Sequence, residues 1–466
     1  MCPIWPLHLI ILYVLAICPL WVLCQAAPEL TANFVPSIVD INMQEYKYVD
    51  VNVQGTNLQT GDVFSVSTRN THIAEAEFNS TAVYTGSEDS TWRGRIRITG
   101  NFLGRTDVTL QAHRGSQQLP ITNSTLPVII VRPQRVIDTI FTTSVATFVS
   151  LIFINFGCAM HWPTVLEVVK RPVGPLIGMA GQFLFMPLMT FGLGFLIFPD
   201  NPAMRLGMFF TGCAPGGGAS NIWTFILGGN LNLSLAMTSI STLASFLFMP
   251  AWLFSLGQVV FRDAKIVVPY VRIATFVIGL IVPLAIGLGM QKWTPRLATF
   301  MVRILKGFST TLLLFIIIFA IVTNLYIFEL FTWQIIVTGM GIPWLGYLAG
   351  YLVAILFRQP HPDALAISIE TGIQNTGIAI FLLRYALGQP EADLTTVVPV
   401  SCAIMTPVPM TAIYIYQRIK ACAGVLSTEE STRKSSKKPT PPYQRRSSRE
   451  SPSSQPLMST GQSSPV

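Results

Sequence analysis

Long apolar stretches dominate the sequence between Ile137 and Tyr416. Each is close to the length of about 20 residues that crosses a bilayer as an α-helix. With 51% hydrophobic and 11% charged residues, the chain is too apolar for an ordinary soluble protein. The sequence therefore predicts an all-α multi-pass membrane domain over residues 134–420, with nine transmembrane helices. The predicted spans are 137–160, 173–198, 204–228, 231–256, 268–290, 304–326, 334–357, 364–387 and 394–416.

The first 26 residues have the pattern of a signal peptide. An apolar run from Leu9 to Leu23 precedes small residues that suit cleavage near Ala26. No Lys or Arg precedes the run, so a retained signal anchor is the alternative. Either way, the following residues are expected outside the cell.

Residues 27–133 predict a small all-β extracellular domain, a β-sandwich. Short alternating runs are separated by Gly, Asn, Ser and Asp. No cysteine lies between Gln25 and Gly157, so the domain depends on its own core rather than on disulfides. Asn79 and Asn123 begin glycosylation sequons. An extracellular protein partner for this domain is left open. The runs are 46–53, 63–68, 92–99, 106–113 and 126–131.

Residues 421–466 predict a disordered, basic, Ser- and Pro-rich tail. Nine spans after an outside amino terminus put this tail in the cytoplasm, as its Lys and Arg residues also indicate. Such a tail can hold anionic membrane lipid. Because residues 418–466 carry nine basic and three acidic groups, the net charge of +8 does not indicate nucleic-acid binding. The plasma membrane is the default location.

Two predicted spans are interrupted in the middle. The third contains Cys-Ala-Pro-Gly-Gly-Gly-Ala-Ser-Asn (213–221), and the eighth contains Ile-Glu-Thr-Gly-Ile-Gln-Asn (369–375). Glycine and proline let a helix unwind, which is tolerated at membrane depth only around a protein-enclosed site. Five spans apart, the two run in opposite directions, as inverted repeats do. Secondary transporters place their substrate and ion sites where two such helices meet.

Glu370 lies within the eighth span, where a charge costs roughly 2.5–3.5 kcal/mol on insertion scales. It is therefore expected to face the interior and to bind a cation, a proton or a basic partner. The oxygen-bearing side chains nearby suit sodium better than a transition metal, which prefers His or Cys. Taken singly, most of these residues would more often be structural. No nucleophile–base pair or phosphate loop indicates an enzyme. The residues are Gln182, Ser220, Asn221, Ser234, Thr238, Gln374 and Asn375.

These motifs, with Asn-Leu-Ser-Leu-Ala-Met-Thr (232–238), resemble the sodium/bile acid cotransporter family over residues 136–417. The resemblance implies a core domain, a panel domain and two crossing discontinuous helices. It implies a first sodium site of Ser220, Asn221, Ser234, Thr238 and Glu370, and a second of Gln182, Glu370 and Gln374. Substrate contacts would involve Asn375, Thr371 and Asn221. Sodium is the coupling ion, and no other cofactor is implied.

Two departures from the family pattern bear on function. Gly218 stands where the family commonly has Asn, and the long outer domain resembles that of the family's orphan members. The expected function is sodium-coupled symport of an amphipathic organic anion, such as a bile acid or a sulfated steroid. The alternative is an orphan surface receptor or adhesion protein with a non-transporting core. Deleting residues 27–130 would separate the two, because a receptor could not keep its binding.

Overall fold

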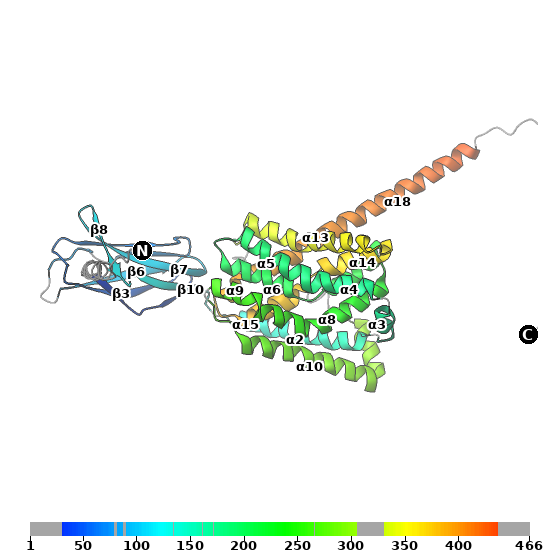
Figure 1. Cartoon of the computed structure of the whole chain (residues 1–466), viewed down its shortest axis with the longest axis horizontal. Helices are drawn as coiled ribbons and strands as arrows, with labels where there is room; N and C mark the ends of the chain where they lie inside the picture. The colour runs from blue at the N-terminus through cyan, green and yellow to red at the C-terminus, as the bar shows by residue number, and fades with distance from the viewer. Residues whose placement is uncertain are drawn as a thin grey trace, which may run out of the picture. The chain divides into compact units, whose positions relative to one another are not determined.

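The computed structural model describes residues 30–436, except 79–81, 87–89, 134, 161, 171, 265 and 305–329. It consists of an N-terminal all-β region, here called the β-domain (Leu30–Val131), followed by helices (Figure 1). The predicted signal peptide, nearly all of the predicted sixth span and the tail beyond Ser436 lie outside the described residues.

The β-domain contains two sheets. One has the strand order β5-β6-β3-β1-β9, and the other β2-β10-β7-β4, with β8 beside β7. All five predicted strands are present, as β3, β4, β6, β7 and β10. Strands β1, β2, β5, β8 and β9 were not predicted, and β8 and β9 are only three and two residues long. The strands are β1 Leu30–Val35, β2 Val39–Asn42, β3 Tyr46–Gln54, β4 Val63–Thr68, β5 Ala74–Phe78, β6 Thr91–Gly100, β7 Gly104–Arg114, β8 Gln117–Leu119, β9 Ile121–Thr122 and β10 Thr125–Val131.

The two sheets enclose one apolar core. Alternate residues of β3, including Val49 and Val51, point inward, as do Ile96 and Ile98 of β6. Strand β10 contributes Leu126, Val128 and Ile130 from the other sheet to the same cluster. Each fully buried side chain of this kind stabilises the fold by about 1.5–3 kcal/mol. This core explains how the β-domain folds without a cysteine.

The predicted glycosylation acceptor Asn123 is exposed in the turn between β9 and β10. Asn79 lies outside the described residues. Glycosylation at both positions stays a prediction.

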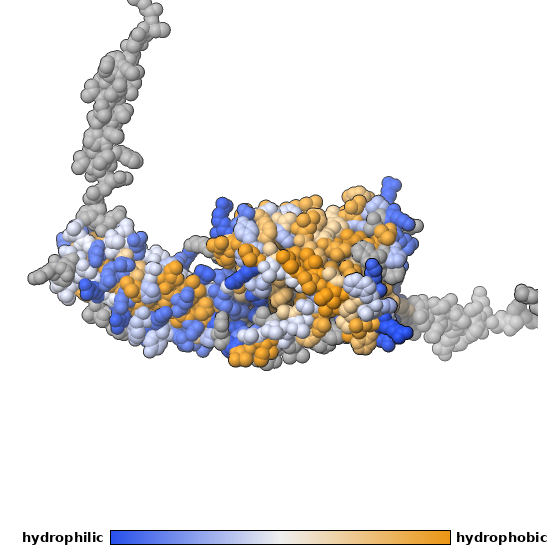
Figure 2. Space-filling view, turned by 90° about the horizontal axis from the view of Figure 1, so that it is seen from below, coloured by the Kyte–Doolittle hydropathy of each residue, from blue (hydrophilic) through white to orange (hydrophobic). Residues whose placement is uncertain are grey.

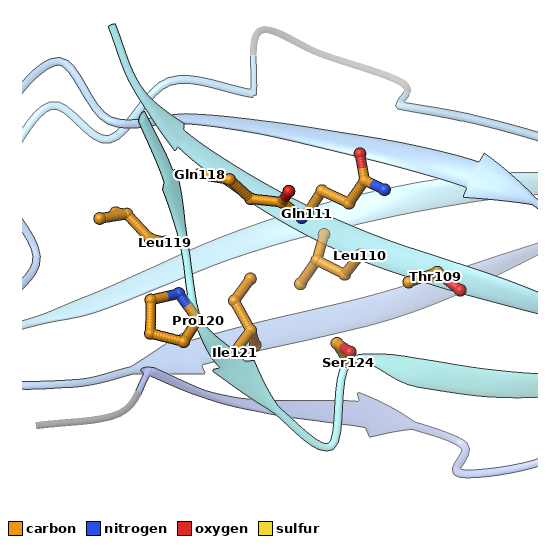
Figure 3. Close-up of a pocket in the computed structure, with 8 residues that line it drawn as sticks. All are labelled: Thr109, Leu110, Gln111, Gln118, Leu119, Pro120, Ile121 and Ser124. Carbon is orange, nitrogen blue, oxygen red and sulfur yellow. The ribbon is translucent and has the colours of Figure 1, made fainter. Parts of the chain in front are cut away.

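A cavity of about 310 Å³ opens between β7 and the β8–β9 segment (Figure 3). Its polar side chains are amides and hydroxyls, such as Gln111, Gln118 and Ser124, and none of its lining residues is ionisable. The chemistry indicated by the sequence therefore lies elsewhere in the chain.

A buried carboxylate of the β-domain, Asp62, forms an ion pair that makes the domain's stability depend on pH. Arg114 donates from Nε to Asp62 Oδ1 (2.7 Å) and from Nη2 to Oδ2 (2.8 Å), and the Gln59 amide donates to the same carboxylate (2.9 Å). The hydrogen bond from Arg114 lowers the pKa of Asp62 below its usual value of 3.8. Because the folded pKa is depressed, this stabilisation is present above the unfolded pKa and is lost as pH falls below about 4. Asp62→Asn should remove this component of the acid sensitivity.

The measurement is thermal unfolding of residues 27–133 by circular dichroism, between neutral pH and about pH 3. Asp50→Asn is the matched control, because its ion pair with Arg95 (2.7 Å) is exposed and such pairs contribute little. Equal acid sensitivity in wild type and Asp62→Asn would contradict the prediction.

The described part of the chain contains six helices that are long and apolar enough to span a membrane. They agree with six of the nine predicted spans. The predicted third and eighth spans are each two short helices, as the interruptions indicated. With the sixth span outside the described residues, the count of nine and the core and panel division stay predictions. The six are Asp138–Ala159, Val173–Ile197, Leu231–Phe254, Tyr270–Trp293, Trp333–Leu356 and Glu391–Ala421.

Two pairs of helices pack along each other. Helix α2 (Val136–Ala159) runs along α10 (Tyr270–Trp293), and α13 (Trp333–Leu356) runs along α14 (His361–Gly372) (Figure 1). Short helices α3 (Trp162–Val169) and α9 (Leu256–Asp263) follow α2 and α8 (Leu231–Phe254).

The surface of the helical part is largely apolar. In the view of Figure 2, hydrophobic residues cover the middle of this part, and hydrophilic residues gather toward its two ends. Large side chains such as Leu348 and Leu352 of α13 and Ile278 of α10 are exposed. A lipid bilayer would cover such a surface, so the chain is a multi-pass membrane protein.

The predicted start of the disordered tail, residue 421, lies inside a helix. Helix α18 begins at Pro407 and continues to Ser436, past residue 421, where the disordered tail was expected to begin. The sequence offers a reason, since Glu429 and Glu430 precede Arg433 and Lys434 by four residues, a spacing that stabilises helices. Residues from Ala412 onward form a unit of their own.

Candidate functional site

The two interrupted spans meet at their breaks. Helices α6 (Pro202–Cys213) and α7 (Ala219–Leu227) make up the third span, and α14 and α15 (Thr376–Ala386) make up the eighth. The unwound segments pair as a short antiparallel bridge between Gly216 and Gln374. Gly217 donates its amide to Ile373 O (2.7 Å), and Asn375 donates its amide to Pro215 O (2.8 Å). Each segment therefore satisfies backbone groups that the other has freed.

This pairing explains the need for small residues. An added Cβ at Gly216 would lie 2.5 Å from Glu370 Oε1, and one at Gly217 would lie 2.9 Å from Gln374 O. A Cβ at Gly218 would meet nothing within 4 Å. The first two glycines are thus required by close approach, and the third is not.

Glu370 is buried beside the crossing, at 2% exposure. Its Oε2 accepts a hydrogen bond from Thr238 Oγ1 on α8 (2.9 Å). Its Oε1 is buried and forms no hydrogen bond. Among the described residues, no Lys or Arg forms an ion pair with this carboxylate. A buried carboxylate without a basic partner is expected to bind a cation or a proton.

Neutral oxygens surround this carboxylate. Ser234 Oγ donates to Asn221 Oδ1 (2.9 Å), and Ser220 Oγ lies 3.4 Å from Thr238 Oγ1. The structure therefore brings together all five residues that the resemblance assigned to a first sodium site. They come from α7, α8 and α14.

Thr224 also belongs to this group and was missed. Its Oγ1 donates to Ser234 Oγ (3.3 Å), and its side chain is buried. Thr224 follows Ser220 by four residues, so the two share a helix face. That spacing was the available signal.

Two of the three residues assigned to a second sodium site, Gln182 and Gln374, are in direct contact, whereas neither forms a hydrogen bond with Glu370. Gln182 Nε2 donates to Gln374 Oε1 (2.7 Å) and to Ala214 O (2.6 Å). Gln182 lies in the π-helical turn η1 (Gly181–Phe185), which continues α4 (Val173–Ala180) and precedes α5 (Met186–Ile197). Such turns occur frequently at functional sites. Neither the π-helical turn nor the Ala214 carbonyl was predicted.

The predicted substrate-contact residues are placed differently from one another. Asn375 is half-buried at the crossing, and its Oδ1 accepts from the Ile378 amide (3.1 Å), which caps α15. Thr371 is fully buried, donates to Ile367 O (2.8 Å), and packs against Gly181 and Gly350. The structure does not bring the Thr371 hydroxyl into the cluster around Glu370.

Backbone dipoles at the crossing also favour a cation. Helices α6 and α14 both end here, at Cys213 and Gly372, and carbonyl ends of helices carry partial negative charge. Half-helices in this arrangement coordinate sodium through such ends. No cluster of three or more His, Cys, Asp or Glu residues suited to a metal ion occurs in the part of the chain that the structure describes.

The fold and the crossing define a multi-pass membrane protein built around two interrupted helices, whose unwound segments pair as an antiparallel bridge. Comparison with known sequences identifies the family within this class of membrane proteins. The model of the Sodium Bile acid symporter family matches residues 146–329. The sodium-dependent organic anion transporter of Rattus norvegicus is 30% identical over 55% of this chain and 69% of its own length. The chain belongs to the sodium bile acid symporter family.

Two further relatives show the range of similarity. The P3 protein of Mus musculus is 31% identical over 58% of this chain, and the ileal sodium/bile acid cotransporter of Cricetulus griseus is 28% identical over 63%. The match covers 84% of that cotransporter but only 57% of the P3 protein, so the chain spans little more than half the length of the P3 proteins it matches. Among solved structures, domains 4 and 5 of the S-layer protein SbsC match 23% of this chain and 54% of their own at 17% identity and a TM-score of 0.17.

Proposed function

We propose that this protein is a sodium-coupled symporter of an amphipathic organic anion, of the bile acid or sulfated steroid class. One observation carries the proposal. The buried Glu370 carboxylate is surrounded by neutral oxygens from Ser220, Asn221, Ser234 and Thr238, where two interrupted helices cross. One negative charge with several hydroxyl and amide oxygens suits a hard monovalent cation.

Sodium at this site would connect three helices. The first-site ligands come from α7, α8 and α14, and the second group links η1 to the crossing through Gln182 and Gln374. Binding of sodium would hold these segments in one arrangement and so prepare the crossing to accept the anion. Rocking of the core against the panel would then alternate access to the site.

The substrate class rests on the relatives and on the crossing. Their names specify bile acids and organic anions. In this chain, the amino-terminal ends of α7 and α15 lie at the crossing, and such ends attract anions. Asn375 and Asn221 offer amide groups there, and Gly218 has no side chain with which to add a contact.

If two sodium ions accompany one monovalent anion, one net positive charge enters per cycle. A membrane potential of 100 mV then contributes about 2.3 kcal/mol to uptake. Transport is therefore expected to depend on voltage. We further propose that the protein lies in the plasma membrane, with the β-domain outside and the carboxyl terminus in the cytoplasm.

The proposal is tested by uptake of labelled taurocholate and a labelled sulfated steroid into expressing cells. Sodium medium is compared with medium in which choline replaces sodium. Uptake of either compound that requires sodium is expected. Equal uptake in the two media would refute sodium coupling, and absence of uptake with the protein at the surface would refute the substrate class.

The alternative is a receptor or adhesion protein with a non-transporting core. Such a scaffold has no need for a buried, unpaired carboxylate, which is costly to keep. Sodium binding by the purified protein separates the two functions. Stabilisation of the purified chain by sodium but not by potassium is expected for the symporter, because only a ligand of the folded state raises its stability.

A further inference from the structure

The β-domain meets the helices at a cluster of charged side chains. We call it the corner cluster, because it surrounds the short helix α16 (Glu391–Leu394) between α15 and α17 (Val397–Met405). The described residues up to Thr411 belong to one compact unit. The corner cluster consists of Arg105 and Arg132 from the β-domain and its end, with Asp138, Arg384, Glu391 and Asp393 from the helices.

Arg105, at the start of β7, donates hydrogen bonds to both carboxylate oxygens of Glu391. Its Nε donates to Glu391 Oε1, and its Nη2 donates to Oε2 (3.2 Å). The Glu391 side chain is only 8% exposed, so this pair is protected from solvent on the carboxylate side. Two-point contacts between guanidinium and carboxylate are the strong and directional form of this interaction.

Asp393 is held from two directions. Its side chain is fully buried, and its two oxygens lie 3.4 Å from Arg132 Nε and 3.0 Å from Arg384 Nη2. Arg132 also donates from Nη2 to Asp138 of α2 (2.6 Å). Arg132 follows β10 directly, whereas Arg384 lies in the last turn of α15. A buried carboxylate is tolerated only while such partners remain in place.

Helix α16 in turn contacts both interrupted spans. It follows α15 in the chain, and Arg384 of α15 forms an ion pair with Asp393 of α16. Thr395, which bonds to Glu391 O through its amide (2.9 Å) and its hydroxyl (2.7 Å), packs directly on Gly207 of α6. Both α6 and α15 are the halves of the interrupted spans that lead from this corner to the crossing at Glu370.

We propose that the β-domain is a fixed part of the gate on its side of the membrane. Through the corner cluster and α16, it holds the end of α15 and the middle of α6, at Gly207. This inference rests on the proposed function, because a gate presupposes a transport cycle. The β-domain then limits how far α6 and α15 move while the crossing binds sodium. A domain attached only by a flexible linker would not contribute Arg105 to a buried carboxylate on α16.

The test is hydrogen exchange of the full-length chain in detergent, with and without sodium. Arg105→Ala is expected to raise the rate of amide hydrogen exchange in residues 376–396 about fivefold. This is the factor by which the loss of one ion pair of ordinary strength shifts a local opening equilibrium. The same variant is also expected to change, by about twofold or more, the sodium concentration at which protection of residues 366–378 from exchange is half-maximal. The exchanged pair Arg105→Glu with Glu391→Arg is expected to restore both values.

Arg95→Ala is the matched control, because it removes another arginine–carboxylate pair of the β-domain, with Asp50 (2.7 Å), away from the corner cluster. Unchanged exchange of residues 376–396 in Arg105→Ala, or an equal change in Arg95→Ala, would overturn the gate role. Failure of the exchanged pair to restore exchange would also overturn it. Lack of sodium protection at residues 366–378 in the wild type would instead count against the proposed function, while residues 376–396 would still decide whether the corner cluster holds the gate.

Discussion

Glu370→Gln is expected to abolish sodium-dependent uptake while leaving the protein at the cell surface. The substitution keeps the size of the side chain and removes the only negative charge in the cluster of Ser220, Asn221, Ser234 and Thr238. Opposite charges about 4 Å apart attract by about 4 kcal/mol at the effective dielectric of a protein site. Because each 1.4 kcal/mol is tenfold in affinity, sodium binding should weaken by about 100-fold or more. Uptake in sodium and choline media, with surface labelling, measures the effect.

A carboxylate on the same helix provides the control. Asp363 lies in the first turn of α14 and accepts a hydrogen bond from Asn230 Nδ2 (2.7 Å), far along the helix from the crossing. Asp363→Asn should therefore keep most of the uptake. Uptake retained in Glu370→Gln, or lost equally in both variants, would refute the central role given to the Glu370 carboxylate.

The sequence could reveal those features of the site that are unusual in a membrane-spanning helix, namely charged residues and helix-breaking residues within an apolar span. A carboxylate at position 370 and the Pro-Gly-Gly-Gly run at 215–218 are costly or disruptive in an apolar span, so they are visible without a structure. The same reasoning identified where the third and eighth spans break. Alternation of apolar residues predicted the longer strands of the β-domain, which are buried on one face.

Other parts of the site have no such signature. The π-helical turn at Gly181–Phe185 depends on tertiary contacts, including the bond from Trp252 Nε1 to Phe183 O (2.7 Å). The Ala214 carbonyl is a backbone group, which residue type does not reveal. The pairing of Arg105 with Glu391 joins residues 286 positions apart, and both residue types are common on surfaces. Long-range pairing and backbone geometry therefore required the structure.

Gly216→Ala is expected to weaken sodium binding, although less than loss of the Glu370 charge does. The new Cβ would lie 2.5 Å from Glu370 Oε1 and 3.3 Å from Ser241 Oγ, so the carboxylate or the crossing backbone has to move. The Gly216 segment is fixed by its bridge to Gln374 and by the bond from Gly217 to Ile373, which leaves the carboxylate to move. Displacing it from Thr238 should raise the sodium concentration for half-maximal uptake by about tenfold or more, as for the loss of about 1.4 kcal/mol of binding.

Gly218→Ala, two residues away in the same glycine run, is the control. It shows whether the contact between a Cβ at residue 216 and Glu370 matters, or whether any alanine in the run has the same effect. Its backbone angle is ordinary for a non-glycine residue (φ −58°), and its Cβ would meet nothing within 4 Å. Alanine there should keep the wild-type sodium dependence, and it also removes some backbone freedom from the unfolded chain. The measurement is uptake against sodium concentration for both variants at matched surface expression. Similar sodium dependence in Gly216→Ala and Gly218→Ala would show that the close approach of Gly216 to Glu370 does not position the carboxylate for sodium.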